Sequence, residues 1–85
     1  MSADEFRKIG FNDHLNVTGT PFHVQTEVLG RGPLKSRTIV YKNGVVQHSE
    51  SQPFLPEGRP MDELQAEVER QHRRIVDFVR SGALS

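Results

Sequence analysis

Four histidines are the residues of this chain whose chemistry could include metal binding or proton transfer: His14, His23, His48 and His72. Histidine metal sites usually need converging ligands at short spacings, such as two residues four apart on a helix, and no pair here has that spacing. His48 and His72 could meet where a predicted strand and a predicted helix pack together. There we expect a buried, hydrogen-bonded pair or two packing positions. No metal site and no cofactor are predicted.

Motifs for nucleophilic catalysis and phosphate binding are incomplete. Ser49 lies between His48 and Glu50, which are triad residue types, but neighbouring strand residues point to opposite faces and cannot converge. No serine lies in a Gly-x-Ser-x-Gly turn. Residues 30–32 read Gly-Arg-Gly, without the third glycine or the following helix of a phosphate-binding loop. No catalytic residue is therefore predicted, and we expect the chain not to be an enzyme.

The segment 31–42 concentrates positive charge in a chain that is neutral as a whole. It holds four basic residues and no acid, namely Arg31, Lys35, Arg37 and Lys42. Since the chain has 11 basic and 11 acidic residues, the remainder holds 7 and 11, a net charge of −4. The simpler interpretation is a solvated hairpin whose charges discourage aggregation at a sheet edge. The functional interpretation is a docking site for an acidic partner or a phosphate group.

Length and composition narrow the class of protein. Eighty-five residues, 34% of them hydrophobic, favour one small domain with a thin core. The absence of cysteine excludes a disulfide scaffold, a thiolate zinc site and a cysteine nucleophile. Zero net charge argues against a general nucleic-acid binder. No apolar run has the length of a signal peptide or a membrane span, so we expect a cytoplasmic protein.

The pattern after residue 12 predicts four short antiparallel strands. Residues 13–29 form two strands joined by a turn at 18–21, the third strand covers 35–42, and the fourth begins at Val45. Asn43-Gly44 predicts a two-residue type I′ hairpin turn. The second strand points one set of residues to the core, namely Phe22, Val24, Thr26 and Val28. The hairpin register pairs Lys42 with Val45, Tyr41 with Val46, Val40 with Gln47, and Ile39 with His48. On this register the core face carries Ile39, Tyr41, Val46 and His48, with Arg37 opposite Glu50.

The remaining segments predict a loop, a helix and an arm. Residues 51–60 hold three prolines and read as a loop, and residues 61–81 read as one amphipathic helix. Asp62 and Gln65 resemble a capping box, and Gly82 ends the helix. Residues 1–12 are expected to be a flexible arm, which Phe6, Ile9 and Phe11 either pin to the domain at 13–82 or dock onto a partner. The fold class is α+β, a four-stranded antiparallel meander with one C-terminal helix packed on one face.

A helix on one face leaves the other face of the sheet exposed. Its polar residues and a small apolar spot suit protein recognition, and two free edges, near Asn16 and Gln47, can accept a partner strand. The candidate partner-binding residues on this face and on the basic segment are His23, Gln25, Glu27, Arg31, Lys35, Arg37, Val40, Lys42, Val45 and Gln47.

Three segments carry a resemblance to a known family. Residues 22–30 read Phe-His-Val-Gln-Thr-Glu-Val-Leu-Gly, residues 41–46 read Tyr-Lys-Asn-Gly-Val-Val, and Gln71-His72 follows late in the chain. Over roughly residues 13–80 the chain resembles the RomX-like family of small bacterial proteins, whose signature is FHVQTE-x-LG. The resemblance implies a polarity protein of the kind found in gliding myxobacteria. Such proteins work with the response regulator RomR and act on the small Ras-like GTPase MglA as a nucleotide-exchange factor.

We therefore expect a non-enzymatic protein-interaction module, a cytoplasmic cell-polarity adaptor that is recruited to a cell pole. An exchange factor needs no catalytic side chain, because tighter binding to the open GTPase shifts the population of that state. The alternatives are a small domain that binds another protein, or a nucleic-acid module that uses the segment 31–42 and binds in a salt-dependent way. A third hypothesis is a small-molecule enzyme or a homodimer that uses His48 and His72.

Overall fold

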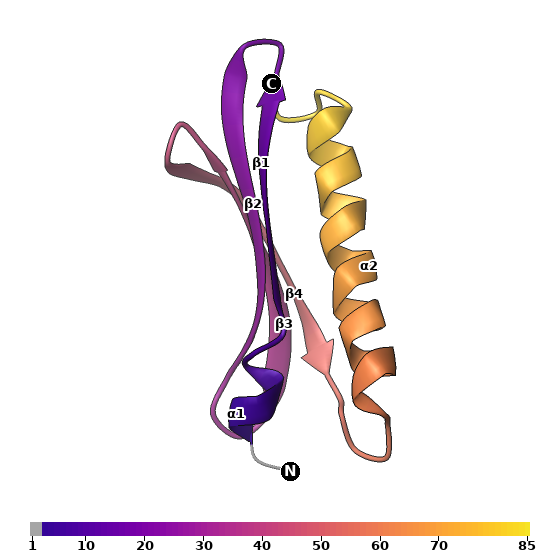
Figure 1. The fold of residues 1–85 in the computed structure, drawn as a ribbon. Coiled ribbons are helices and arrows are strands. Elements are labelled where there is room, and N and C mark those ends of the chain that lie inside the picture. The colour runs from indigo at the N-terminus through magenta and orange to yellow at the C-terminus, as the bar shows by residue number, and fades with distance from the viewer. Residues whose placement is uncertain (1–2) are drawn as a thin grey trace.

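The computed structural model describes residues 3–85 of the chain and confirms the predicted α+β fold (Figure 1). Four strands form one antiparallel meander in the order β1-β2-β3-β4, and a long helix follows them. A short helix that the sequence did not predict precedes β1. The elements are α1 (Ala3–Phe6), β1 (Gly10–Val17), β2 (Thr20–Leu29), β3 (Leu34–Lys42), β4 (Val45–Phe54) and α2 (Met61–Arg80).

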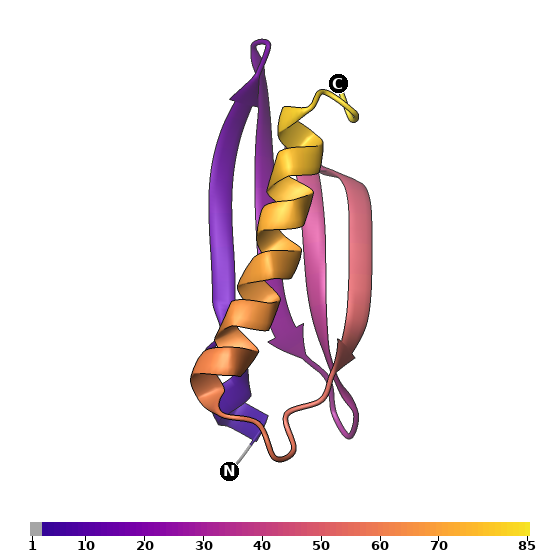
Figure 2. The same cartoon turned by 90° about the vertical axis from the view of Figure 1, so that its right-hand side faces the viewer.

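The sheet has one covered and one uncovered face. Helix α2 crosses a single face obliquely, from the side of β1 at its start toward the middle strands at its end (Figure 2). Nothing in the described part of the chain lies over the opposite face, which we call the uncovered face. No helix among residues 3–85 has the length and apolar character to cross a membrane.

Two tight turns set the hairpins. Asn43 and Gly44 both have positive φ, 51° and 80°, which confirms the predicted turn. The β1–β2 hairpin turns on Thr18 and Gly19, with φ of 49° and 88°, so it is a two-residue turn and shorter than predicted. A β-branched residue is strained at positive φ. The turn compensates in part, because the Asn16 side chain accepts a hydrogen bond of 2.9 Å from the Gly19 amide.

The predicted core face is right for β2 and wrong for β3. Phe22, Val24, Thr26 and Val28 are all buried under α2, as expected. Antiparallel pairing places Val40 opposite Val24 and Thr38 opposite Thr26, and residues paired in this way share a face. Val40 is therefore 0% exposed in the core. Ile39 and Tyr41, which were expected in the core, belong to the uncovered face.

A bulge in the last hairpin corrects the predicted register as well. Lys42 pairs with Val45 and Tyr41 with Val46, as predicted, but Val40 then pairs with His48 rather than with Gln47. Gln47 is the extra residue, and it shifts the rest of β4 by one position. His48 consequently reaches the helix side, where its ring lies 5.5 Å from that of Phe78.

Beyond the bulge, β4 is tied to α2 by an ion pair. Glu50 faces Arg74 of α2 at 2.7 Å and also contacts His48 at 3.1 Å. The hydrogen bond from Arg74 is the main reason that the pKa of Glu50 lies below its ordinary value. The predicted pair of Arg37 with Glu50 is wrong, since the bulge brings Thr38 opposite Glu50.

Two predicted boundaries are also corrected. Residues 51–54 belong to β4 rather than to a loop, and Pro53 is accommodated because β4 is an edge strand, where a missing amide costs no ladder bond. The arm ends earlier than residue 12, because β1 begins at Gly10. Phe6 and Ile9 do pin it, since both are buried and the Phe6 ring lies 5.5 Å from that of Phe54.

The ends of α2 confirm one expected signal and correct another. Pro60 occupies the N-cap with no side-chain hydrogen bond, so Asp62 and Gln65 do not form a capping box. Asp62 instead accepts a hydrogen bond of 2.9 Å from the Glu63 amide. Gly82 has a φ of 85° and its amide donates to the Val79 carbonyl, as expected of a residue that ends a helix.

Replacing Thr18 by asparagine should stabilise the protein. Asparagine tolerates positive φ, so Thr18→Asn should raise the free energy of unfolding by about 1 kcal/mol. The reverse change at the other turn, Asn43→Thr, is the matched control and should lower it by a similar amount. Urea unfolding followed by circular dichroism measures both. If Thr18→Asn lowered the free energy of unfolding, the inference that Thr18 is strained at this turn would be wrong.

Candidate functional site

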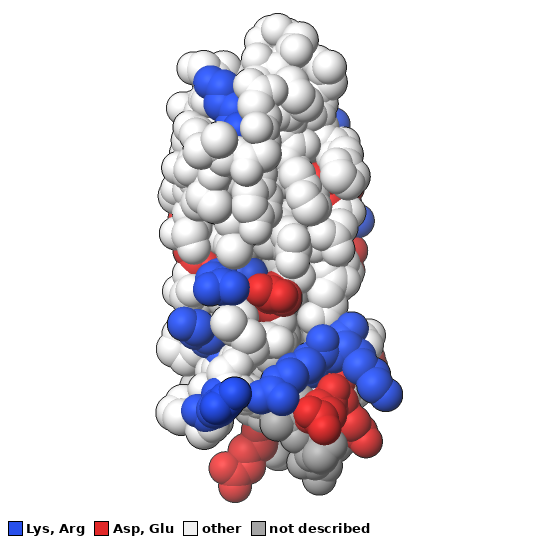
Figure 3. Space-filling view, turned by 90° about the vertical axis from the view of Figure 1, so that its left-hand side faces the viewer, with Lys and Arg blue, Asp and Glu red and all other residues white. Residues whose placement is uncertain are grey.

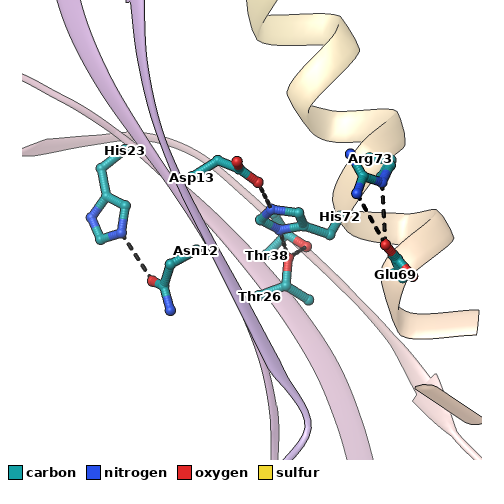
Figure 4. A network of polar contacts seen from close by, with 8 residues as sticks. All are labelled: Asn12, Asp13, His23, Thr26, Thr38, Glu69, His72 and Arg73. Atoms are coloured by element: carbon teal, nitrogen blue, oxygen red, sulfur yellow. Dashed lines mark hydrogen bonds and ion pairs between the residues drawn. The ribbon is translucent and has the colours of Figure 1, made fainter. Parts of the chain in front are cut away.

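A chain of hydrogen bonds crosses the core between α2 and the sheet (Figure 4). The His72 imidazole is 2% exposed, and both of its nitrogens have partners. Its Nδ1 lies 2.7 Å from Thr26 Oγ1, and its Nε2 lies 2.6 Å from Asp13 Oδ2. Thr26 Oγ1 lies in turn 2.7 Å from Thr38 Oγ1. The helix is thereby bonded to three strands at one level.

The available donors assign a direction to this chain. Gln71 Nε2 donates to Thr38 Oγ1 at 3.1 Å, so the Thr38 hydroxyl can donate to Thr26. Thr26 then donates to Nδ1 of His72, and the Nε2–H of His72 donates to the Asp13 carboxylate. Gln71 is satisfied as well, because its Oε1 accepts from the Ser36 hydroxyl at 2.6 Å. Each member of the network finds a partner when His72 is neutral and carries its proton on Nε2.

Asp13, His72 and Thr26 have the residue types and order of a catalytic triad, but the nucleophile is closed off. Thr26 is 1% exposed, and its hydroxyl lies between the sheet and α2. A substrate carbonyl cannot approach an oxygen in that position without removing the helix. The arrangement therefore acts as a structural tie. His48 is not part of it, so the hydrogen-bonded pair of His48 with His72 is wrong, whereas the alternative of two separate packing positions agrees with the structure.

A second cluster, on the uncovered face, is a ladder of stacked rings. His14 and His23 stack at 4.4 Å between ring centres with planes 12° apart. His23 and Tyr41 follow at 5.6 Å and 24°. The three residues are cross-strand neighbours on β1, β2 and β3. Asn12 fixes the central ring, because its side-chain oxygen lies 3.0 Å from His23 Nε2 on this side of the sheet (Figure 4).

The two spacings in the ladder follow from the turn at Thr18-Gly19. A two-residue turn of this kind closes on a hydrogen-bonded pair, here Val17 and Thr20, and pairs alternate from there. His14 and His23 therefore form a non-hydrogen-bonded pair, in which side chains come closest. On its other side His23 forms a hydrogen-bonded pair with Tyr41, in which side chains lie farther apart. The observed order of the two distances agrees with this alternation.

The ladder borders a hollow in an uncharged part of the surface. An open hollow of about 370 Å³ is lined by rings and backbone of the β1–β2 and β3–β4 hairpins, including Pro21, His23 and Tyr41. Val46, paired with Tyr41, is 54% exposed on this face. Val45, which was predicted on this face, is 61% exposed but pairs with Lys42 and so belongs to the helix side. Figure 3 shows few charged side chains on the half of this face near the β1–β2 turn and many on the other half.

The basic segment divides between two places. Arg31 and Lys35 are exposed at the end of the sheet that carries most of the charges, and Arg37 on the uncovered face contacts Glu27 at 3.0 Å. Lys42 lies at the other end of β3 on the helix side, with its Nζ 3.5 Å from the Leu84 carbonyl. The four cations are not one strip, so the prediction of a single basic surface is wrong. Among residues 3–85 they provide no continuous track for a nucleic-acid backbone.

The remaining candidate residues are placed as follows. His23, Gln25 and Glu27 lie half-buried on the uncovered face, as predicted. Gln47 is exposed at the bulge, and Val40 is removed from the set because it is a core residue. Sequence reasoning missed His14 and Tyr41. The alternation of β2 already placed His23 on this face. Which residue of β1 lies opposite His23 depends on the length of the β1–β2 turn, and that length was predicted wrongly.

Replacing Thr26 by valine tests the inner network. Thr26→Val keeps the shape but leaves His72 Nδ1 without a donor and the Thr38 hydroxyl without an acceptor. The free energy of unfolding should fall by about 1–3 kcal/mol. Thr26→Ser keeps the hydroxyl and loses one methyl, so it should cost less. Nitrogen NMR of the His72 ring should report the Nε2–H tautomer in the wild type. Equal losses for the two variants would contradict the network.

Lowering the pH should destabilise the protein through His23. Burial, and secondly the charge of His14, lower the pKa of His23 from its ordinary value of 6.5. The native state therefore binds fewer protons than the unfolded chain just below that pH, so stability is lost as pH falls below 6.5. His23→Gln should reduce the difference in unfolding free energy between neutral and mildly acidic pH. His14→Gln should reduce it less, because it removes only the smaller cause. An unchanged pH dependence in His23→Gln would contradict this assignment.

Comparisons with protein-family models, with curated proteins and with solved structures found no match to this chain. The family resemblance therefore depends on the three segments quoted from the sequence. Function has to be argued from the geometry of the uncovered face and of the inner network.

Proposed function

We propose that the chain is a non-enzymatic protein-interaction module that binds its partner with the uncovered face of the sheet. The observation that carries this proposal is the ring ladder of His14, His23 and Tyr41, flanked by the exposed Val46. Centres of protein interfaces are depleted of charge and enriched in aromatic side chains, with a polar rim. The uncovered face has this composition, since its charges gather at one end (Figure 3).

The ladder is also prepared for binding before a partner arrives. Stacking and the hydrogen bond that Asn12 accepts from His23 restrain the His23 ring, and paired strands restrain the backbone beneath it. Side chains that are already ordered lose little conformational entropy on association. Mutual stacking also occupies the inner ring faces. This favours contact with ring edges by a protein partner over intercalated stacking of nucleic-acid bases.

The family-like segment 22–30 supports a role for this face. Its residues alternate, so Val24 and Thr26 serve the core and the inner network, whereas His23, Gln25 and Glu27 point to the uncovered face. The packing of the domain explains the first group. The second group contributes little to the core, and partner binding accounts for its presence in the signature.

In this proposal the partner has an apolar patch and, beside it, acidic groups that meet Arg31 and Lys35. The resemblance points to the Ras-like GTPase MglA as that partner, with the response regulator RomR as a second component, and to a place of action at a cell pole. Binding would promote nucleotide exchange by favouring the open state of the GTPase. No side chain of this chain would enter the chemistry.

Replacing Tyr41 by alanine tests the proposal. Tyr41→Ala removes the outer ring of the ladder without touching the core, so it should weaken binding to MglA in the presence of RomR by about tenfold or more. The release of a fluorescent guanine nucleotide from MglA should slow accordingly. Arg73→Ala, on the exposed side of α2, is the control and should behave as the wild type.

Two results would contradict the proposed function. One is a wild-type chain that neither binds MglA nor accelerates nucleotide release with RomR present. The other is a Tyr41→Ala variant with a wild-type circular dichroism spectrum and unchanged binding, which would place the interface elsewhere.

A further inference from the structure

We propose that β1 is a pairing edge, and that a second copy of this chain adds its own β1 to it in antiparallel orientation, centred on His14. The two four-stranded sheets would then form one continuous sheet across a two-fold axis. This interface uses the edge of the sheet. It shares His14 and Asn12 with the ring ladder but leaves His23 and Tyr41 open, so the proposed function can hold or fail without it.

The two edges of the sheet differ in how they are protected. The β4 edge carries Pro53 and the bulge at Gln47, and both devices interrupt pairing with a further strand. The β1 edge carries neither, because its register with β2 is regular from Gly10 to Val17. Residues 10–17 contain no proline, lysine or arginine, and the carboxylate of their one acid, Asp13, is engaged by His72 on the helix side. Along most of its length, away from its lower end, β1 has no other element of residues 3–85 beyond it in Figure 2.

The backbone of β1 presents matching groups along this edge. Since Val17 forms a hydrogen-bonded pair with Thr20, the alternation directs the amides and carbonyls of Asn12, His14 and Asn16 away from β2. A second β1 centred on His14 pairs the two His14 residues with each other, and Asn12 with the second copy's Asn16. These three pairs form about six backbone hydrogen bonds.

The side chains of β1 are self-complementary about the same centre. The outer face of the His14 ring is free, and the second copy's His14 stacks on it, which joins the two ring ladders. Asn12 meets the second copy's Asn16 on the same face, as one amide beside another. On the helix side Phe11 meets the second copy's Val17, and both are partly buried apolar residues. Asp13 meets Leu15 rather than a second carboxylate.

Other centres fit less well. A centre at Asp13 would place two carboxylates directly opposite each other. A centre at Asn12 would pair His14 with Gly10, which ends the ladder and shortens the overlap. The edge therefore selects His14 as the point of symmetry.

A charge at residue 14 tests both the edge and its register. Sedimentation equilibrium of the wild type should show a reversible monomer–dimer equilibrium. His14→Lys should weaken it by about tenfold or more, because like charges would lie directly opposite each other. His14→Glu should do the same alone, whereas an equimolar mixture of the two variants should form a heterodimer. Ser51→Lys puts the same charge on the exposed β4 edge and should leave the dimer intact.

A cysteine at the same position gives an independent reading that does not depend on a weakened variant. The chain contains no cysteine, so His14→Cys has one thiol. Hydrogen-bonded antiparallel residues have Cα atoms about 5.5 Å apart, which permits a disulfide between the two copies. Mild oxidation should cross-link His14→Cys rapidly and Ser51→Cys far more slowly.

Any of three results would overturn the proposal. The first is a wild type that stays monomeric up to millimolar concentration. The second is equal or faster cross-linking of Ser51→Cys, which would assign the contact to β4 or to random collision. The third is failure of the two oppositely charged variants to associate, which would exclude the register centred on His14.

Discussion

A buried imidazole needs a hydrogen-bond partner for each of its two nitrogens, and meeting that need at His72 determines how the helix lies on the sheet. Apolar contacts alone would let α2 slide or rotate over a smooth surface of valines. The bonds to Thr26 and Asp13 allow one position along the helix axis. They also divide the core, since one apolar cluster around Phe22 and Val79 lies on one side and one around Phe54 and Leu64 on the other.

The uncovered face depends indirectly on the same constraint. Thr26 can reach His72 only if the even-numbered residues of β2 face the helix, which sends the odd-numbered ones, His23 among them, to the opposite side. The hydrogen-bond network under α2 and the ring ladder on the uncovered face therefore use opposite faces of the same strand, β2. A slip of β2 by a single residue would remove both. This coupling explains how an 85-residue chain holds an ordered surface with a thin core.

Local signals in the sequence predicted the elements well and their long-range relations poorly. Alternation in β2, the Asn43-Gly44 turn and the apolar stripe of α2 are each contained in one segment, and all three were found. The core face of β3 was assigned wrongly because the hairpin with β4 was taken as the guide, whereas pairing with β2 decides the matter. The bulge at Gln47 has no local sequence signature.

The candidate site was predictable in part. His23, Gln25 and Glu27 were placed on the correct face, because strand alternation is sufficient for that inference. The residues that stack against His23 were not predicted. Thr18 is an unusual residue at positive φ, so the turn was predicted to be longer than it is. The inner network required residues from β1, β2, β3 and α2 to converge, which no spacing along the chain encodes.

The extra residue at Gln47 separates the β3–β4 hairpin into two independent parts. Toward the tip, Val46 shares the uncovered face with Tyr41, whereas His48 and Glu50 beyond the bulge engage α2. Without the bulge, strict alternation would place Val46 and His48 on the same side. Because the phase changes at Gln47, a substitution at Val46 alters the uncovered face without altering the contacts that His48 and Glu50 make with α2.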